Sequence, residues 1–356
     1  MRIGILTYHY PENRNYGALL QLYALYSTLE RMGHIPYVIR YKFGSISYQG
    51  FKGFIINILI YILETRVFIS FSKKYLKNKT IPVTHANAHH LNDCLDTFIV
   101  GSDQVWRAKY VPNIKDFFFQ FVNENKKKIS YAASFGSDTW NEVSQEVTEE
   151  IKLLLTRFSA VSVREQSGIE ICKKLGCNNA EIVLDPVFLL SQSDYLKLIK
   201  RKHAKQKTIS YFLLDSISLT TFNTIQSFSK SQKATLINLK GKQLPIIPQG
   251  IPLKYSFSQW LFYIQNSELI ITDSFHCVAF CLIFKKQFIC IPNINRGFTR
   301  LESLLKILDL QDRISPELNV NSLNYAHNNP IDYLKVNSIL EPLKEKSINF
   351  LKQNLQ

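Results

Sequence analysis

The first 41 residues, MRIGILTYHYPENRNYGALLQLYALYSTLERMGHIPYVIRY, decide the fold. Ile3–Tyr8 is predicted to be a short apolar strand, and leucine and tyrosine recur between residues 19 and 29 with the spacing of a helix. Gly33 ends this helix, and Pro36–Tyr41 is the next predicted strand. A strand, a helix and a second strand in this order form the building block of a parallel sheet with covering helices.

The same alternation continues along the chain and then restarts. Apolar strands are predicted at Thr97–Val100, Lys128–Ala133 and Ala160–Val163, and a second series begins with Thr208–Leu214. A length of 356 residues also favours two domains, because single hydrophobic cores stop growing below that size. We therefore expect an α/β protein with an N-terminal domain at 1–190 that carries a basic helical insertion at 42–92, a linker at 191–207, a second domain at 208–330 and a C-terminal helix at 331–356.

The net charge of +15 indicates affinity for polyanions, because 43 lysines and arginines stand against 28 acidic residues. Phosphorylated small molecules and anionic lipid are the candidate partners, and a merely solubilising surface is the alternative. Nucleic acid is not expected, since the sequence has no zinc-finger spacing and no glycine-aromatic RNA-binding signature. None of the six cysteines is spaced C-x-x-C, so we expect buried reduced thiols, no metal site and a cytoplasmic protein.

The most apolar run is Phe54–Leu63, which is about half as long as a membrane span. Lys52, Glu64 and Arg66 flank it. We expect a helix that is either buried or lies on a membrane surface, and burial is the favoured interpretation. With the positive charge, the second interpretation would allow peripheral contact with the inner face of the cell membrane.

Polar residues follow the predicted strands, and the carboxyl ends of parallel strands border the ligand crevice of an α/β sheet. In Ile270–His276 an apolar strand leads into polar groups and then a helix. Ser274 can cap that helix. The N-terminus of the helix is the positive end of its dipole and suits phosphate or carboxylate. His276 falls in the first turn, where it can act as an acid or a base. The alternative is a helix cap with a histidine that is only a polar neighbour.

Three arginines are candidate anion ligands, because guanidinium groups bind phosphate and carboxylate in bidentate fashion. Arg296 and Arg300 follow the strand Phe288–Ile291, and Arg164 ends Ala160–Val163. The alternative for Arg296 and Arg300 is that they are surface arginines, and the alternative for Arg164 is that it forms a structural ion pair. The sequence has no dinucleotide fingerprint, P-loop or nucleophile elbow. The remaining crevice candidates, each after a strand, are Asn15, Tyr16, Gly17, Ser102, Asp103, Ser134 and Gly136.

Seven blocks of the sequence, in order and within residues 1 to about 310, resemble the polysaccharide pyruvyl transferase family. They are Asn15–Gln21, Phe98–Trp106, Ile129–Gly136, Val161–Glu165, Val183–Pro186, Ile271–His276 and Asn295–Arg296. The resemblance implies two Rossmann-like domains that face each other across a cleft, as in GT-B glycosyltransferases. It also implies phosphoenolpyruvate as co-substrate, no cofactor, and a ketal on a sugar of a cell-surface polysaccharide or its lipid-linked precursor.

The resemblance places a catalytic histidine at His276 and a substrate-binding basic residue at Arg296. Some members carry Asn-x-Gly-Asp in the first loop, and here Ala18 stands where they have the acid. The acceptor is then activated differently, with Asp103 as the candidate, or this branch performs different chemistry. A nucleotide-sugar glycosyltransferase of the same fold and a non-catalytic glycan-binding relative are the alternatives.

Overall fold

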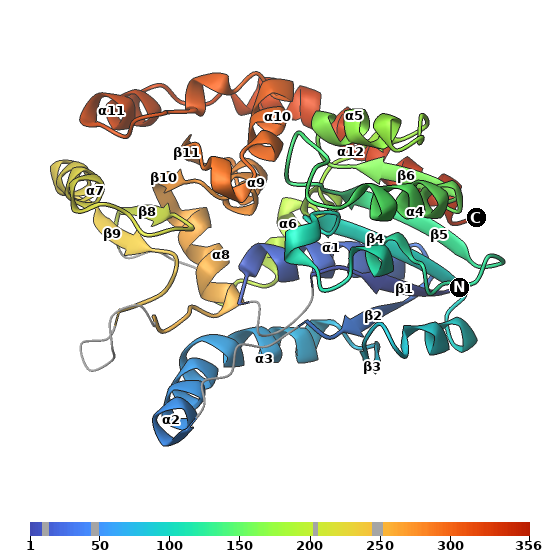
Figure 1. The fold of residues 1–356 in the computed structure, drawn as a ribbon. Coiled ribbons are helices and arrows are strands. Elements are labelled where there is room, and N and C mark those ends of the chain that lie inside the picture. Colours follow the sequence, from blue (N-terminus) through green and yellow to red (C-terminus); the bar gives the residue numbers. More distant parts are fainter. Residues whose placement is uncertain (9–13, 44–49, 202–205, 244–251) are drawn as a thin grey trace. The chain divides into compact units, whose positions relative to one another are not determined.

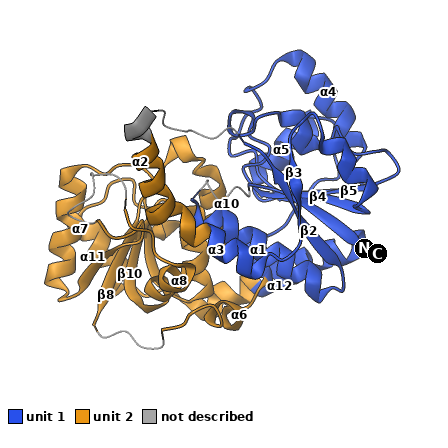
Figure 2. Cartoon of the chain, turned by 90° about the horizontal axis from the view of Figure 1, so that it is seen from below, with its two compact units in different colours: residues 1–47, 69–189, 341–356 blue, residues 48–68, 190–340 orange. Residues whose placement is uncertain are grey.

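The computed structural model describes residues 1–8, 14–43, 50–201, 206–243 and 252–356. The chain divides into two compact units (Figures 1 and 2). Unit 1 consists of residues 1–47, 69–189 and 341–356, and unit 2 of residues 48–68 and 190–340.

Unit 1 is built on a parallel sheet that has seven strands within the described residues, in the order β3-β2-β1-β4-β5-β6-β7. The strand order reverses direction at the pair β1 and β4, which makes this pair the switch point of a Rossmann-like sheet. β4 is buried along its whole length, as a central parallel strand covered on both faces should be. The strands are β1 (Arg2–Leu6), β2 (Ile35–Tyr41), β3 (Lys79–Val83), β4 (Thr97–Asp103), β5 (Lys127–Ala133), β6 (Ala160–Val163) and β7 (Glu181–Ile182).

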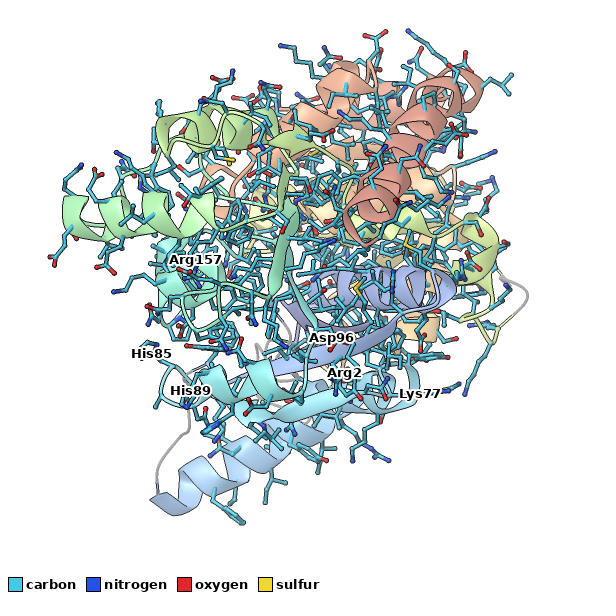
Figure 3. The ribbon with its side chains drawn as sticks, turned by 90° about the vertical axis from the view of Figure 1, so that its right-hand side faces the viewer. Arg2, Lys77, His85, His89, Asp96 and Arg157 are labelled. Carbon is cyan, nitrogen blue, oxygen red and sulfur yellow. The ribbon has the colours of Figure 1, made fainter. Side chains whose placement is uncertain are left out.

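Side chains at the two ends of this sheet differ in kind. At the amino ends of β1 and β4, Arg2 and Asp96 point toward one another, with Nη2 and Oδ1 2.9 Å apart (Figure 3). In the parallel pairing of β1 with β4, Ile3 lies opposite Thr97, so Arg2 and Asp96 are neighbours one residue earlier. The polar residues predicted to bind ligand lie at the carboxyl ends of the strands. The helices of unit 1 are α1 (Tyr16–Arg31), α4 (Gln145–Thr156), α5 (Gln166–Lys174) and most of α3 (Arg66–Tyr75) and α12 (Tyr333–Asn354).

Unit 2 has a smaller parallel sheet, with four strands among its described residues in the order β11-β10-β8-β9. Its switch point is the pair β8 and β10, whose apolar residues form the core with Ile289 of β11 and Ile225 of α7. The strands are β8 (Thr208–Phe212), β9 (Thr235–Asn238), β10 (Ser267–Thr272) and β11 (Gln287–Cys290). The helices are α2 (Gly50–Ile60), α6 (Gln192–Leu196), α7 (Leu219–Ser231), α8 (Phe257–Asn266), α9 (Phe275–Ile283), α10 (Thr299–Ile307) and α11 (Val320–Asn328).

The architecture of two Rossmann-like sheets is confirmed, but three segments differ from the sequence-based expectation. The region 42–92 is not wholly a helical insertion, because β3 within it extends the sheet beside β2; Pro82 weakens the strand signal there. Residues 48–68 group with unit 2. In the region 191–207 residues 192–196 form α6, and residues 202–205 lie outside the described chain.

The C-terminal helix α12 belongs mostly to unit 1. Ser347 lies on its buried side, where its hydroxyl accepts a hydrogen bond from the backbone N–H of Leu184 at 2.9 Å. Near its end the ammonium group of Lys127 donates to the carbonyl of Asn354 at 3.0 Å. The chain therefore ends by packing on the unit in which it began.

The apolar run Phe54–Leu63 lies in α2 and in a π-helical segment at Tyr61–Thr65. The expectation that this run is buried is wrong, because most of its side chains are exposed or half-buried and only Leu63 is buried. Within the described chain, Phe54–Tyr75 is the one helix long and apolar enough to cross a membrane by length and composition.

Candidate functional site

The switch point of unit 1 carries a buried polar network. Ser102 and Asp103 end β4, and the Ser102 hydroxyl donates to the Asp185 carboxylate at 2.9 Å. The Ser102 carbonyl accepts from the hydroxyl of Thr7, which follows β1, at 2.9 Å. Asp103 has a left-handed backbone with φ of 71°, and such strain concentrates at functional sites. The structure thus joins two of the predicted crevice residues at the place where a Rossmann-like sheet binds its ligands.

Arg164 is the most deeply engaged of the predicted anion ligands. Its Nη1 donates to Asp185 at 2.6 Å, its Nη2 lies 3.6 Å from Asp103, and its side chain is 1% exposed. Burial lowers the pKa of Arg164, but the neighbouring carboxylates of Asp185, Asp103 and Glu165 outweigh it and raise the pKa. This geometry favours the structural ion pair over the ligand clamp, because Asp185 already holds the guanidinium.

Ser134 and Gly136 follow β5 and shape the backbone around Glu165. The Ser134 hydroxyl donates to Glu165 Oε1 at 2.8 Å and accepts from the backbone N–H of Gly136 at 3.0 Å. Gly136 has φ of +62°, and a Cβ there would lie 2.0 Å from the side-chain oxygen of Gln104. The left-handed backbone at this position therefore favours glycine, and a larger residue would also have to displace the Gln104 side chain.

Asn15, Tyr16 and Gly17 form the start of α1. The Asn15 side chain caps the helix by accepting from the backbone N–H groups of Gly17 at 2.9 Å and Ala18 at 3.3 Å. Asn15 is exposed, whereas Tyr16 and Gly17 are buried. Of the three, Asn15 is thus the one accessible from outside.

In unit 2, β10 leads directly into α9, as expected from the sequence. Ser274 is the N-cap, and its hydroxyl accepts from the backbone N–H of Cys277 at 3.5 Å. His276 lies in the first turn, 6% exposed, with its ring edge-on to that of Phe275 at 5.4 Å. An imidazole is thus fixed beside the positive end of a helix, where it can exchange a proton with an anionic ligand.

The two arginines after β11 have different surroundings. Arg300 is buried, donates to the carbonyls of Gly297 at 3.1 Å and Arg296 at 2.7 Å, and places its guanidinium 6.0 Å from the ring centre of Phe275. It thereby fixes the loop that carries Arg296. The Arg296 side chain is 48% exposed and its Nη2 donates to Asp215 at 2.6 Å. An exposed pair of this kind contributes about 0–1 kcal/mol, so an anionic ligand can replace Asp215 at little cost.

Two carboxylates and an amide that we did not predict to bind ligand complete this cluster. The Asn293 side-chain amide donates to Asp273 at 2.7 Å and to Asp215 at 2.9 Å. Hydrogen bonds from Arg296 and Asn293 lower the pKa of Asp215, whereas burial raises the pKa of Asp273. Asp215 and Asn293 each follow a predicted strand. The rule that ligands bind at the carboxyl ends of parallel strands, which identified Ser274 as a candidate, could therefore also have identified these two residues.

A cavity of about 490 Å³ lies beside this cluster, at the carboxyl ends of β8, β10 and β11. Its wall combines aliphatic side chains with hydroxyl and carboxylate groups, which include Ser216, Thr221, Asp215, Asp273 and Glu317. Carboxylates accept hydrogen bonds and repel anions, so the cavity suits a ligand rich in hydroxyl or N–H groups. Arg296 does not line the cavity, but its guanidinium pairs with Asp215, which does.

Metal coordination finds no support in the described residues, because no group of three or more His, Cys, Asp or Glu side chains lies in position to hold an ion. The two clusters instead offer arginine, imidazole, carboxylate and hydroxyl groups.

Solved structures share the fold of this chain at low sequence identity. UDP-GlcNAc 2-epimerase from Neisseria meningitidis bound to UDP-GlcNAc matches with a TM-score of 0.60 at 10% identity, over 100% of this chain and 99% of its own. MnaA of S. aureus, in a structure with UDP, matches with a TM-score of 0.55 at 12% identity. The match covers 100% of this chain and 96% of the MnaA chain. Arabidopsis thaliana UGT89C1 matches with 0.54 at 10% identity over 98% of each chain. The expected GT-B architecture is confirmed.

The family is shown by sequence rather than by these structures. No curated protein matches this sequence. The model of the family described as polysaccharide pyruvyl transferase matches residues 15–295, which is most of the chain. This range contains the first-loop cap Asn15, the helix start with His276 and the residues Asp215, Asp273 and Asn293, and it ends one residue before Arg296. The chain therefore belongs to the polysaccharide pyruvyl transferase family.

Proposed function

We propose that the protein transfers a pyruvyl group from phosphoenolpyruvate to a sugar of a cell-surface polysaccharide or of its lipid-linked precursor. The observation that carries the proposal is the carboxyl edge of the unit 2 sheet, where His276 lies in the first turn of α9 and Arg296 follows β11. Phosphoenolpyruvate has a phosphate and a carboxylate, and both need cationic or N–H partners. Family membership supports the same reaction class.

Arg296 is the donor ligand in this proposal. Its guanidinium exchanges the Asp215 carboxylate for the phosphate or carboxylate of the donor. Arg300 acts as a positioning residue, because it holds the backbone carbonyl of Arg296. The N-terminus of α9 adds backbone N–H groups and a positive dipole end. Preorganised positive charge of this kind is usually the largest contribution to catalysis.

The reaction then proceeds in two additions at one carbon. His276 in its protonated form delivers a proton to the methylene carbon of phosphoenolpyruvate, which makes the neighbouring carbon electrophilic. A sugar hydroxyl adds to that carbon and gives its proton to a base. A second hydroxyl of the same sugar then attacks that carbon and closes the ketal. The bond from this carbon to the phosphate oxygen breaks, and inorganic phosphate leaves with the proton of the second hydroxyl. No oxidant, reductant or cofactor takes part.

Asp103 is the candidate residue for orienting the acceptor. Its strained backbone and its position at the switch point of unit 1 favour a functional role. Asn15, exposed at the start of α1, is a further acceptor ligand. We place the reaction in the cytoplasm, at the inner face of the cell membrane, because a lipid-linked acceptor is held there.

A nucleotide-sugar glycosyltransferase is the second candidate. The cavity beside Asp215 and Asp273 favours it, since carboxylates there could accept hydrogen bonds from ribose hydroxyls or a nucleobase. Two structural neighbours are described with UDP or UDP-GlcNAc bound.

Thermal unfolding with each ligand, followed by a transfer assay, separates the candidates. We expect phosphoenolpyruvate to raise the unfolding temperature and to yield inorganic phosphate with a glycan precursor. The variant His276→Ala should lose at least about 100-fold in rate while it keeps the unfolding temperature of the wild type. Stabilisation by a nucleotide sugar alone, or near-full activity of His276→Ala, contradicts the proposal.

A further inference from the structure

The exposed apolar side chains of α2 and the π-helical segment form one stripe. Phe54, Ile55, Ile58, Tyr61 and Ile62 are 60, 44, 41, 50 and 48% exposed. Their spacing of one, three, three and one residues is that of a single helix face, but here the apolar face points to solvent. Isolated exposed apolar residues are ordinary, whereas a continuous stripe marks an interaction surface. We call these five residues the apolar stripe.

The base of the stripe is held to unit 2. The carbonyl of Leu63 accepts from the backbone N–H of Lys254 at 2.8 Å, and the ring of Phe68 packs edge-on against Phe257 at 5.3 Å. Leu63 and Phe68 are buried. These contacts fix the C-terminal end of the helix that carries the stripe, and α2 belongs to unit 2 (Figure 2).

The stripe is too short to cross a bilayer. Nine residues of helix extend about 13 Å at 1.5 Å per residue, against a hydrocarbon core of about 30 Å. The continuation of the helix cannot supply the missing length, because Leu63, Phe68 and Phe71 are buried in the protein. A stripe of this length can only lie along a surface.

The charges on and around the helix identify the surface. No described residue from Phe54 to Tyr61 is acidic, and the buried Glu64 lies 4.0 Å from Lys254. Arg66 is exposed at the start of α3, Lys73 and Lys74 occupy its last turn, and the chain carries a net charge of +15. Aliphatic side chains with a tyrosine and flanking cations match a bilayer with anionic headgroups.

We propose that the apolar stripe docks the protein on an anionic lipid bilayer, with the side chains inserted at the boundary between headgroups and acyl chains. The contact places unit 2 at a membrane surface. Its purpose, access to a lipid-linked acceptor, rests on the function proposed above, but the contact itself does not.

Vesicle flotation tests the contact with the full chain and no substrate. The probes are vesicles of phosphatidylcholine alone and of phosphatidylcholine mixed with phosphatidylglycerol, at low and high salt. The test variant is Ile58→Glu/Ile62→Glu. The matched control is Leu153→Glu/Leu219→Glu, which adds the same charge at side chains that are 70 and 75% exposed outside the stripe. A neutral pair, Phe54→Ser/Ile58→Ser, removes apolar area without adding charge.

We expect wild type and control to bind the phosphatidylglycerol vesicles within about twofold of each other, and the two stripe variants to lose about tenfold or more. Binding should weaken with salt and be low on phosphatidylcholine alone. Unchanged unfolding temperatures exclude misfolding as the cause. Equal binding by the stripe variants overturns the proposal. The proposal is also overturned if the wild type binds neither kind of vesicle but forms a dimer that the stripe variants do not form. In that case the stripe contacts a second copy of the chain. The flotation experiment does not use transfer activity as its readout. Failure of membrane binding can therefore be distinguished from failure of the proposed phosphoenolpyruvate-dependent transfer.

Discussion

Removal of the Arg164 guanidinium should destabilise unit 1 rather than weaken donor binding. The variant Arg164→Met keeps most of the side-chain volume and leaves the carboxylate of Asp185 without its cation. Asp185 would keep hydrogen bonds from the Ser102 hydroxyl at 2.9 Å and the Val187 backbone N–H at 3.1 Å. The substitution thus tests whether a charge is required in a place where hydrogen bonds remain.

The magnitude follows from the burial of the pair. The side chains of Arg164 and Asp185 are 1 and 0% exposed, and Nη1 and Oδ2 are 2.6 Å apart. Breaking a buried pair from one side costs about 3–5 kcal/mol, because an uncompensated charge stays in the interior. The double variant Arg164→Met/Asp185→Asn removes both charges and should cost less than Arg164→Met alone. Asparagine at 185 can still accept from the Val187 N–H.

Urea unfolding followed by tryptophan fluorescence measures these costs. The chain has three tryptophans, of which Trp106 and Trp140 lie in unit 1 and Trp260 in unit 2. In a Trp260→Phe background the signal therefore reports unit 1. The same proteins are compared for the KM of phosphoenolpyruvate. A stability loss below about 1 kcal/mol for Arg164→Met, together with a large rise in KM, would show that the arginine binds the donor and that the structural interpretation is wrong.

Two further predictions concern Arg296 and Lys128. Arg296→Ala should raise the KM of phosphoenolpyruvate by about tenfold or more, since a charge-assisted hydrogen bond contributes about 1.5–3 kcal/mol; Arg296→Lys should keep part of the affinity, and an unchanged KM in steady-state assays would remove Arg296 from the site. Burial lowers the pKa of Lys128 from 10.5 to about 8. The unfolded chain then binds more protons between these values, so this group makes stability rise with pH across that window, by up to about 1.4 kcal/mol per pH unit. Urea titrations at several pH values should show that Lys128→Met lacks this rise, and identical pH slopes for both proteins would contradict the assignment.

Local patterns predicted the elements that form the two sheets. The strand, helix and second strand predicted within residues 1–41 appear as β1, α1 and β2, and Ile270–His276 as the end of β10 and the start of α9. Such patterns work because side-chain period and capping depend on residues close in the sequence. They failed at Phe54–Leu63, where apolar composition indicated burial although, in the part of the chain that the structure describes, the side chains of the stripe stay exposed.

The sequence by itself determined the α/β class, the family and the edge of each sheet where polar residues gather. Only the tertiary structure decided which arginines are engaged by carboxylates. Arg164 meets Asp185 from 21 residues away, and Arg296 meets Asp215 from 81 residues away. Such pairs depend on the order of the strands in the sheet and on which loops lie side by side. The free energy that selects this arrangement comes from packing of the whole core, so no short stretch of sequence predicts it.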